Sequence, residues 1–146
     1  MVGISAGVSY GQLGATHHSI HDIAVLRAIN NINIVVPADN FETKEVIKSA
    51  VNFKHPLFIR FGKRPMVKLH EGEHNFKIGN GIKIKSGSDL TIIATGETVQ
   101  RALKASELLE KLNINCTLIS MHTIKPFDEE IFLNSISRVK AVISVE

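Results

Sequence analysis

Short apolar runs that alternate with helical patterns constrain the fold of this 146-residue chain more than any other feature. Four runs are rich in apolar residues, many of them β-branched, and have the length of buried strands: 32–36, 57–61, 90–96 and 114–121. Helical spacing of apolar residues covers 20–30, 40–52 and 97–112. Strands that alternate with helices are typical of parallel sheets covered by helices. We therefore expect an α/β fold.

A break in this alternation divides the chain into two units. Residues 62–81 lose the apolar periodicity and contain four glycines, one proline and six lysines, arginines or histidines. We interpret the break as an interdomain linker; a long surface loop within one domain is the alternative. The predicted organisation is a first domain at 1–64, a linker at 65–80 and a second domain at 81–146.

Both domains are expected to be partial Rossmann-like units with mainly parallel strands. Each has few strands, and no helix closes the last one, whereas a doubly wound sheet normally has helices on both faces. The remaining elements are a short strand within 1–19, a strand or hairpin at 81–90, a helix at 128–137 and a strand at 139–145. Such incomplete units are expected of pieces of a longer chain.

Helix starts can be predicted at two positions. Ser19 is placed to cap the helix at 20–30, whose apolar face would include Ile20, Ile23 and Ile29. Asp39, with Glu42 three residues later, resembles a capping box with Asp in place of Ser or Thr. The second helix should therefore begin directly after Asp39.

Composition excludes several classes of function. The net charge is +3, but the basic residues are scattered and not interleaved with aromatic residues, so we expect no nucleic-acid binding. No apolar run approaches the roughly 20 residues needed to cross a bilayer. The N-terminus has no secretory signal pattern, and we expect a cytoplasmic protein without membrane association. Cys116, the single cysteine, is interpreted as a core thiol and not as a nucleophile.

Chemistry-bearing residues concentrate at 11–27, where a glycine-rich turn leads into a helical pattern. His17 and His21 could form a zinc pair only if one helix included both, and no second cluster at ligand spacing completes such a site. We interpret His18 and His21 as exposed or locally hydrogen-bonded. The role of His17 stays open, because a histidine at the end of a glycine-rich loop is also a suitable acid or base near neutral pH. One local basic cluster, Lys63, Arg64 and Lys68, indicates an anionic ligand.

Seven short motifs occur in a characteristic order: GATHH, DIAVLR, VPAD, ET, IRFGK, IATG and TIKPFD. The first five resemble the second half of the pyrimidine-binding domain of transketolase-like, thiamine diphosphate-dependent enzymes. The last two resemble the start of the C-terminal domain of the same family. The resemblance covers almost the whole chain and is greatest to the separate C-terminal transketolase subunits found in many prokaryotes.

This resemblance implies transfer of a two-carbon ketol unit, with the cofactor as electron sink. In the family, the histidine that matches His17 lies beside the thiazolium and the substrate, where it helps to move protons. Lys63 matches a position that often holds a phosphate-binding arginine, and lysine keeps the charge but not the bidentate fork. Leu13 and Ser5 stand where sugar-phosphate transketolases carry an acidic residue and a phosphate-binding histidine. These two departures weaken the case for an ordinary pentose phosphate.

The resemblance also implies a partner. The family's cofactor-activating glutamate and its diphosphate-binding GDG motif have no counterpart in this sequence. We therefore expect thiamine diphosphate and Mg²⁺ to be bound mainly by an N-terminal transketolase subunit or domain. The assembly would be a homodimer or hetero-oligomer acting on a small ketose or related molecule, and this chain alone should be inactive.

Two other interpretations of the sequence stay open. One is a non-catalytic, degenerate module for dimerisation or regulation, which Leu13 and Ser5 favour slightly. The other is a related thiamine enzyme, such as a deoxyxylulose phosphate synthase or the β subunit of a 2-oxo acid dehydrogenase.

Overall fold

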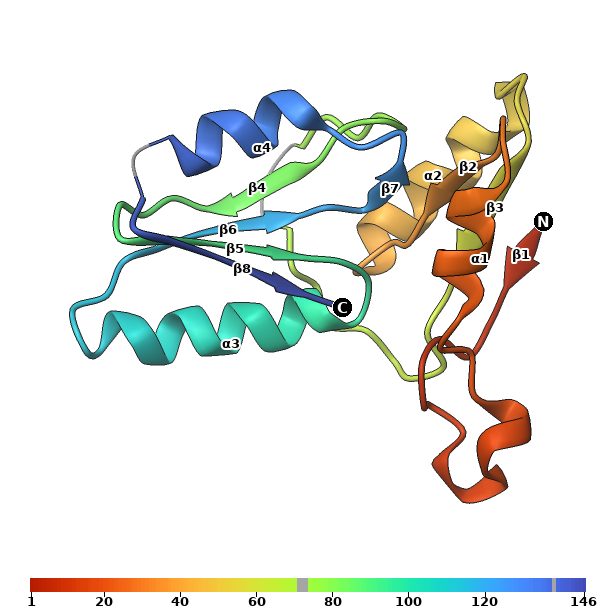
Figure 1. Ribbon diagram of the computed structural model, residues 1–146, viewed down its shortest axis with the longest axis horizontal. Coiled ribbons are helices and arrows are strands. Elements are labelled where there is room, and N and C mark those ends of the chain that lie inside the picture. Colours follow the sequence, from red (N-terminus) through yellow and green to blue (C-terminus); the bar gives the residue numbers. More distant parts are fainter. Residues whose placement is uncertain (71–73, 138) are drawn as a thin grey trace.

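The computed structural model describes residues 1–70, 74–137 and 139–146, and these residues form two four-stranded sheets (Figure 1). The first sheet has the order β1-β3-β2-β7, with β1 at Val2–Gly3, β2 at Asn33–Val35, β3 at Leu57–Arg60 and β7 at Thr123–Lys125. The second has the order β4-β6-β5-β8, with β4 at Ile82–Lys85, β5 at Leu90–Ala94, β6 at Cys116–Ser120 and β8 at Ala141–Val145. The predicted α/β class is confirmed.

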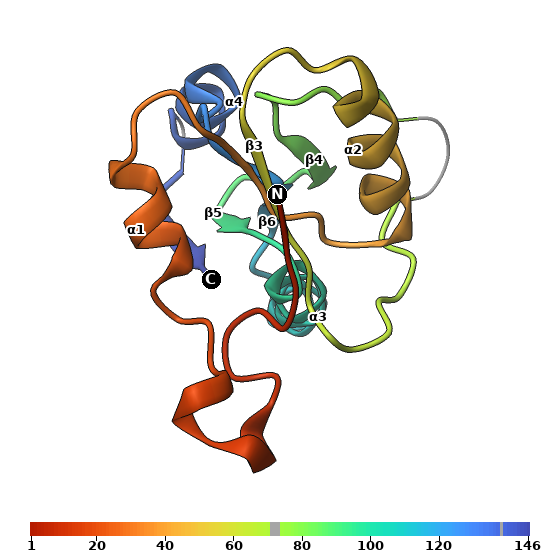
Figure 2. The same ribbon diagram turned by 90° about the vertical axis from the view of Figure 1, so that its right-hand side faces the viewer.

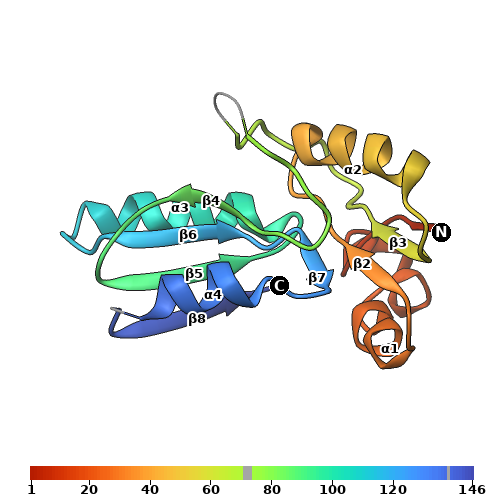
Figure 3. The ribbon, with the colours of Figure 1, turned by 90° about the horizontal axis from the view of Figure 1, so that it is seen from above.

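Helices α1 (Asp22–Ala28) and α2 (Asn40–Asn52) lie on opposite sides of the first sheet (Figures 2 and 3). Strands β1, β3 and β2 run parallel, and β7 is antiparallel to β2. Successive side chains of a strand point to opposite faces. Ile34 accordingly packs in the cluster with Ile23 of α1, while Val35 packs with Val46 of α2.

Helices α3 (Thr98–Glu110) and α4 (Glu129–Ile136) enclose the second sheet from its two faces (Figure 1). Strand β5 is parallel to β6 and β8, and β4 is antiparallel to β6. Ile92 and Leu118 pack with Val99 of α3 in the largest core cluster. On the other face, the Thr91 hydroxyl donates to the Ser135 carbonyl at 2.7 Å, which links the sheet to α4.

The predicted cap of α2 is confirmed. The Glu42 N–H donates to Asp39 Oδ1 at 2.9 Å. The Glu42 side chain does not return to the N–H of the cap residue, as in a capping box, but accepts from the Ala38 N–H at 2.7 Å. Both carboxylates are fully buried, so the start of α2 is fixed inside the protein.

The first helix is shorter than predicted. It begins at Asp22, and the Ser19 side chain does not cap it, because the Ser19 backbone pairs with Gly7 instead. Of the predicted apolar face, Ile23 is buried whereas Ile20 is 58% exposed. Within the glycine-rich segment the chain forms two 3-10 turns, η1 (Gly11–Leu13) and η2 (Ala15–His17), which the pattern did not indicate.

Strand β7 was not predicted, and it links the two units. The chain leaves β6 in the second sheet and pairs Thr123–Lys125 with β2 in the first. Leu69 and His70, which belong to the predicted linker, are buried, while residues 71–73 of that linker lie outside the described residues. The domain limits 1–64, 65–80 and 81–146 stay a prediction.

Two further features bear on the sequence predictions. Cys116 is 1% exposed, which confirms a core thiol, and burial raises the pKa of this thiol. Among the helices of the described residues, none is both long enough and apolar enough to cross a membrane.

Candidate functional site

A loop formed by residues 7–19, here called the His17 loop, projects from the base of the first sheet (Figures 1 and 2). Its two ends are joined by backbone hydrogen bonds, from Gly7 N–H to the Ser19 carbonyl at 3.0 Å and from Ser19 N–H to the Gly7 carbonyl at 2.9 Å. Gly14, with φ 73°, connects the two 3-10 turns in a conformation that glycine adopts readily. The result is an exposed loop with a closed neck.

Arg60 fixes this neck to the sheet. The Arg60 guanidinium, largely buried at the end of β3, donates through Nε to Asp22 Oδ2 at 2.8 Å. It also donates through an Nη to the Ser19 carbonyl at 2.8 Å. One side chain therefore joins a strand end, the neck of the loop and the first turn of α1. The sequence contained a signal for this role, because a charged residue inside the apolar run LFIRF must find partners when it is buried.

Two of the predicted site residues meet at Tyr10. The Lys63 Nζ lies 3.1 Å from the centroid of the Tyr10 ring, a cation–π contact. The His17 ring lies 5.8 Å from the same ring, centroid to centroid, at a tilt of 56°. His17 Nδ1 is 3.0 Å from Thr16 Oγ1. Tyr10 thus lies between the predicted proton-transfer residue and the predicted anion-binding residue.

Sequence reasoning missed Tyr10 as a site residue. The motifs assign it no role, and its contact with Lys63 joins positions 53 residues apart. The available signal was that Tyr10 is the single tyrosine of the chain and lies next to Gly11, in a segment that already looked like a site.

Lys63 changes the acid–base properties of Tyr10. It is the main cause of a lowered pKa of the Tyr10 phenol, because its positive charge next to the ring favours the phenolate. Ser5 also lowers the pKa of Tyr10, although Ser5 Oγ makes no hydrogen bond with the described residues. Ser5 is buried and has a left-handed backbone with φ 68°. It therefore lies below the site and does not face solvent.

The fourth predicted residue, Leu13, lies in η1 with its side chain 53% exposed. It packs in none of the core clusters of the described residues. The zinc alternative lacks its premise, because His17 belongs to η2 while α1 begins at Asp22, so that one helix does not carry both histidines. Within 1–70, 74–137 and 139–146, no group of three or more His, Cys, Asp or Glu side chains is arranged to hold a metal ion.

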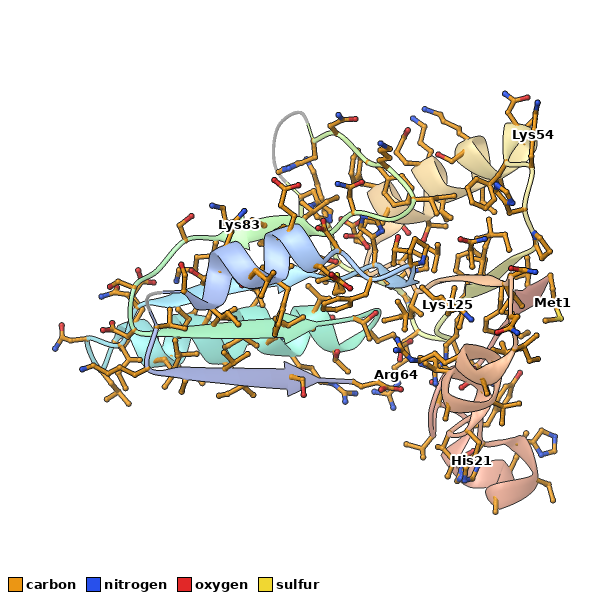
Figure 4. The ribbon with its side chains drawn as sticks, turned by 45° about the horizontal axis from the view of Figure 1, so that its top comes forward. Met1, His21, Lys54, Arg64, Lys83 and Lys125 are labelled. Atoms are coloured by element: carbon orange, nitrogen blue, oxygen red, sulfur yellow. The ribbon has the colours of Figure 1, made fainter. Side chains whose placement is uncertain are left out.

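A cleft of about 390 Å³ lies between the neck of the His17 loop and the start of α3. Arg64, which lines it, lies between the second sheet and the loop (Figure 4). Gly62 also lines the cleft, and a side chain there would overlap the Glu97 carboxylate. The cleft therefore joins both units next to Lys63, and glycine at position 62 lets them approach closely.

A second polar cluster lies buried between the units, away from the loop. Glu42 Oε1 is 2.8 Å from His70 Nε2 and accepts a hydrogen bond from Ser120 Oγ at 2.6 Å. Nearby, the His122 ring stacks on Phe76 with centroids 4.3 Å apart. Burial lowers the pKa of His122, against a smaller opposing effect of Glu42. We interpret this cluster as a structural junction, because it is closed to solvent.

The exposed cluster has chemistry suited to an anionic substrate. A histidine can donate or accept a proton near neutral pH, and an ammonium group recognises an oxyanion by charge. Because the His17 and Lys63 side chains are exposed, a ligand or a partner surface can reach both.

Comparison with known protein families gives matches over both halves of the chain. The model described as "Transketolase, pyrimidine binding domain" matches residues 1–67, and the model described as "Transketolase, C-terminal domain" matches residues 79–146.

Individual relatives extend the same similarity over the full chain. A subunit of an apulose-4-phosphate transketolase from Phocaeicola vulgatus is 40% identical over 100% of this chain and 47% of its own length. A putative transketolase C-terminal section from Methanocaldococcus jannaschii is 42% identical over 92% of this chain and 43% of its own length. A solved split-gene transketolase, an inactive beta4 tetramer, superposes with a TM-score of 0.88 at 30% identity, over 99% of this chain and 47% of that one.

Proposed function

The chain belongs to the transketolase family, and from this premise we propose that it forms one side of an active site that transfers a two-carbon ketol unit between sugars or related carbonyl compounds. It spans about half the length of the curated relatives it matches. The other side of the site would come from an N-terminal transketolase subunit or domain. The assembly would be a homodimer or a hetero-oligomer.

The observation that carries this proposal is that Tyr10 and His17, on one exposed loop, come together with Lys63, which follows β3. Transketolases as a family depend on thiamine diphosphate, which when bound would supply an electron sink for breaking the carbon–carbon bond next to a ketose carbonyl. The residues of this chain fit the substrate side of such a site, because they offer an imidazole, an ammonium and a phenol to an incoming ligand. In the part of the chain that the structure describes, no group of three or more His, Cys, Asp or Glu side chains could hold a metal ion, so we assign Mg²⁺ and the diphosphate to the partner.

In this assignment His17 transfers a proton to or from the substrate. The contact of Nδ1 with Thr16 orients the ring, and Nε2 makes no hydrogen bond with the described residues. Nε2 is thus available to exchange a proton with the oxygen of a bound substrate. Lys63 holds the anionic end of the substrate, and the partner surface that covers the loop excludes water from the site.

Two properties of the relatives support this assignment. The substrate in the name of the Phocaeicola protein carries a phosphate, which fits the charge of Lys63. The solved split-gene protein is an inactive tetramer of beta chains, which fits the requirement for a second kind of subunit.

The experiment that tests the proposed function is an activity assay of the chain mixed with its N-terminal partner, thiamine diphosphate and Mg²⁺. His17→Ala should lower kcat about 10²- to 10⁴-fold, the usual contribution of a positioned acid or base. His55→Ala, which removes an exposed histidine elsewhere, is the matched control and should keep wild-type kcat. A His17→Ala assembly with wild-type kcat would refute the role of His17.

The alternative function is a non-catalytic module for dimerisation or regulation. The departures at Leu13 and Ser5 favour it, since neither side chain can read a substrate hydroxyl or phosphate as an acidic residue or a histidine would. A chain that binds the partner tightly but yields no turnover with any of several phosphorylated ketoses would support this alternative over catalysis.

A further inference from the structure

We propose that Tyr10 is a positioning residue that sets the preference of the site for substrates with an anionic end group. It would do so by holding the Lys63 ammonium in place. This inference rests on the proposed function and extends it to a residue and a substrate class. The chemistry is that of a tetrahedral oxyanion, such as a phosphate ester, meeting one ammonium group.

The contact between Lys63 and Tyr10 is the first step of the argument. Lysine has a flexible four-carbon stem, and an exposed ammonium group in an irregular segment would sample many positions. Here Nζ lies 3.1 Å from the Tyr10 ring centroid, and no carboxylate of the described residues forms an ion pair with it. The ring face therefore restricts the ammonium without neutralising its charge. An acidic partner would have removed the attraction for an anion.

The second step is the position of Tyr10 between two chain segments. The His17 loop is closed at its neck by Gly7 and Ser19, while Lys63 follows the end of β3. The Tyr10–Lys63 contact therefore ties the body of the loop to the first sheet. The same ring lies 5.8 Å from the His17 ring, so the anion-binding group and the proton-transfer group are neighbours of one side chain.

The third step concerns which substrates such a site can distinguish. A single ammonium lacks the bidentate geometry of a guanidinium, so it senses charge more than shape. The site should therefore discriminate strongly between a phosphorylated ketose and its unphosphorylated counterpart. It should discriminate weakly between two substrates that both end in a tetrahedral oxyanion.

The test uses the complete assembly with its partner, thiamine diphosphate and Mg²⁺, and compares a phosphorylated ketose with the same ketose lacking phosphate. Tyr10→Leu removes the ring face and should raise KM for the phosphorylated ketose about fivefold, with kcat within about twofold. Tyr10→Phe keeps the face and should stay near the wild type. KM for the unphosphorylated ketose should change for neither variant.

Coupling between the two residues is tested with Lys63→Met and the double variant. Lys63→Met should also raise KM for the phosphorylated ketose, and adding Tyr10→Leu should raise it no further, because the ring acts through the ammonium. Lys54→Met removes the same charge at the far end of α2 and is the matched control (Figure 4). Additive effects, or equal losses of Tyr10→Leu on both ketoses, would overturn the inference.

A second readout separates this inference from the proposed function. The chain has one tyrosine and no tryptophan, so the absorbance change near 295 nm on raising pH reports Tyr10 alone. In the isolated chain, Lys63→Met should raise the pKa of Tyr10 toward 10.0, and Lys54→Met should leave it unchanged. An unchanged pKa in Lys63→Met refutes the inference even if the assembly is active. A wild-type assembly without turnover on any ketose refutes the proposed function itself, and with it the claim about substrates.

Discussion

The buried side chain of His122 makes the stability of this protein depend on pH. Its ring is fully buried against Phe76, and Nδ1 lies 3.0 Å from Thr123 Oγ1. Burial lowers its pKa below 6.5, while the charges of Glu42 and Asp128 oppose this and His70 adds to it. The unfolded chain therefore binds a proton at this position more readily than the folded protein does.

This difference predicts a loss of stability on acidification. A histidine with a lowered folded pKa contributes stability above its unfolded pKa, about 6.5, and that stability is lost as pH falls through the folded pKa. Urea unfolding between pH 8 and pH 5 should show this fall in the free energy of unfolding. His122→Gln should reduce the slope over that range, and the exposed-site control His55→Gln should not. Parallel pH profiles for the wild type and His122→Gln would contradict the assignment.

Gly62 is a second residue whose environment determines what can replace it. A Cβ at this position would overlap the Glu97 carboxylate. We expect Gly62→Ala to lower the free energy of unfolding by at most about 1 kcal/mol, the low end of the cost of overpacking, because the flexible Glu97 side chain can move away from its contact with the Arg64 N–H. Gly11→Ala is the matched control, because a Cβ there would meet no atom within 4 Å. Unfolding curves measure both, and the double variant Gly62→Ala/Glu97→Ala should recover part of the loss.

At the scale of elements, the start of α2 unites a helix cap with the contact between the units. Asp39 Oδ1 caps α2, while Oδ2 accepts from the Leu69 N–H at 3.0 Å and the His70 N–H at 3.3 Å. Asp128 caps α4 in a similar way, accepting from Ile131 N–H at 3.0 Å and Gly81 N–H at 2.8 Å, but it is only partly buried.

Asp39→Ala should therefore cost more than Asp128→Ala. Loss of an N-cap costs about 1 kcal/mol, and a buried N–H left without an acceptor costs about 1–3 kcal/mol. Because the N–H groups of both Leu69 and His70 lose their acceptor in addition to the loss of the cap, we expect at least about 3 kcal/mol for Asp39→Ala and less for Asp128→Ala, where water can replace the acceptor. Chemical denaturation measures the loss of unfolding free energy in both variants. Equal losses would contradict the explanation that burial makes Asp39 the more important of the two caps.

Elements with a strong local signal could be predicted from the sequence. Helix α3 follows from its apolar spacing, and the start of α2 follows from Asp39 and Glu42. Strand β7 could not be predicted, because its three residues pair with β2 about 90 positions earlier. The length of α1 was overestimated for a related reason: Ser19 pairs with Gly7 and so cannot cap the helix.

The candidate site shows the same limit of local reasoning. His17 and Lys63 were identified from motifs, but the ring of Tyr10, which contacts Lys63, was given no role by them. From the sequence, Arg60 was predicted only to belong to a strand, and Glu42 only to belong to a helix cap. Their partners, Ser19 and Ser120, are distant in sequence, and no periodicity reports such pairs.

On the scale of the whole molecule, the two units meet through polar contacts, through the packing of Ala38 in the core of the second unit and through a shared cleft. Glu42 of α2 accepts from Ser120 at the end of β6, so the network joins the two sheets. The His17 loop lies outside this junction and projects from the first sheet (Figure 2). A loop that is exposed and carries His17 and Tyr10 fits the proposed active site that a partner completes.

The most direct test of this shared site is a calorimetric titration of thiamine diphosphate with Mg²⁺ into the chain alone, into its N-terminal partner alone and into the mixture. We expect saturable, high-affinity binding in the mixture, and none with this chain alone. Tight binding of the cofactor by this chain without the partner would contradict the central claim that it supplies only the substrate-facing side of the site.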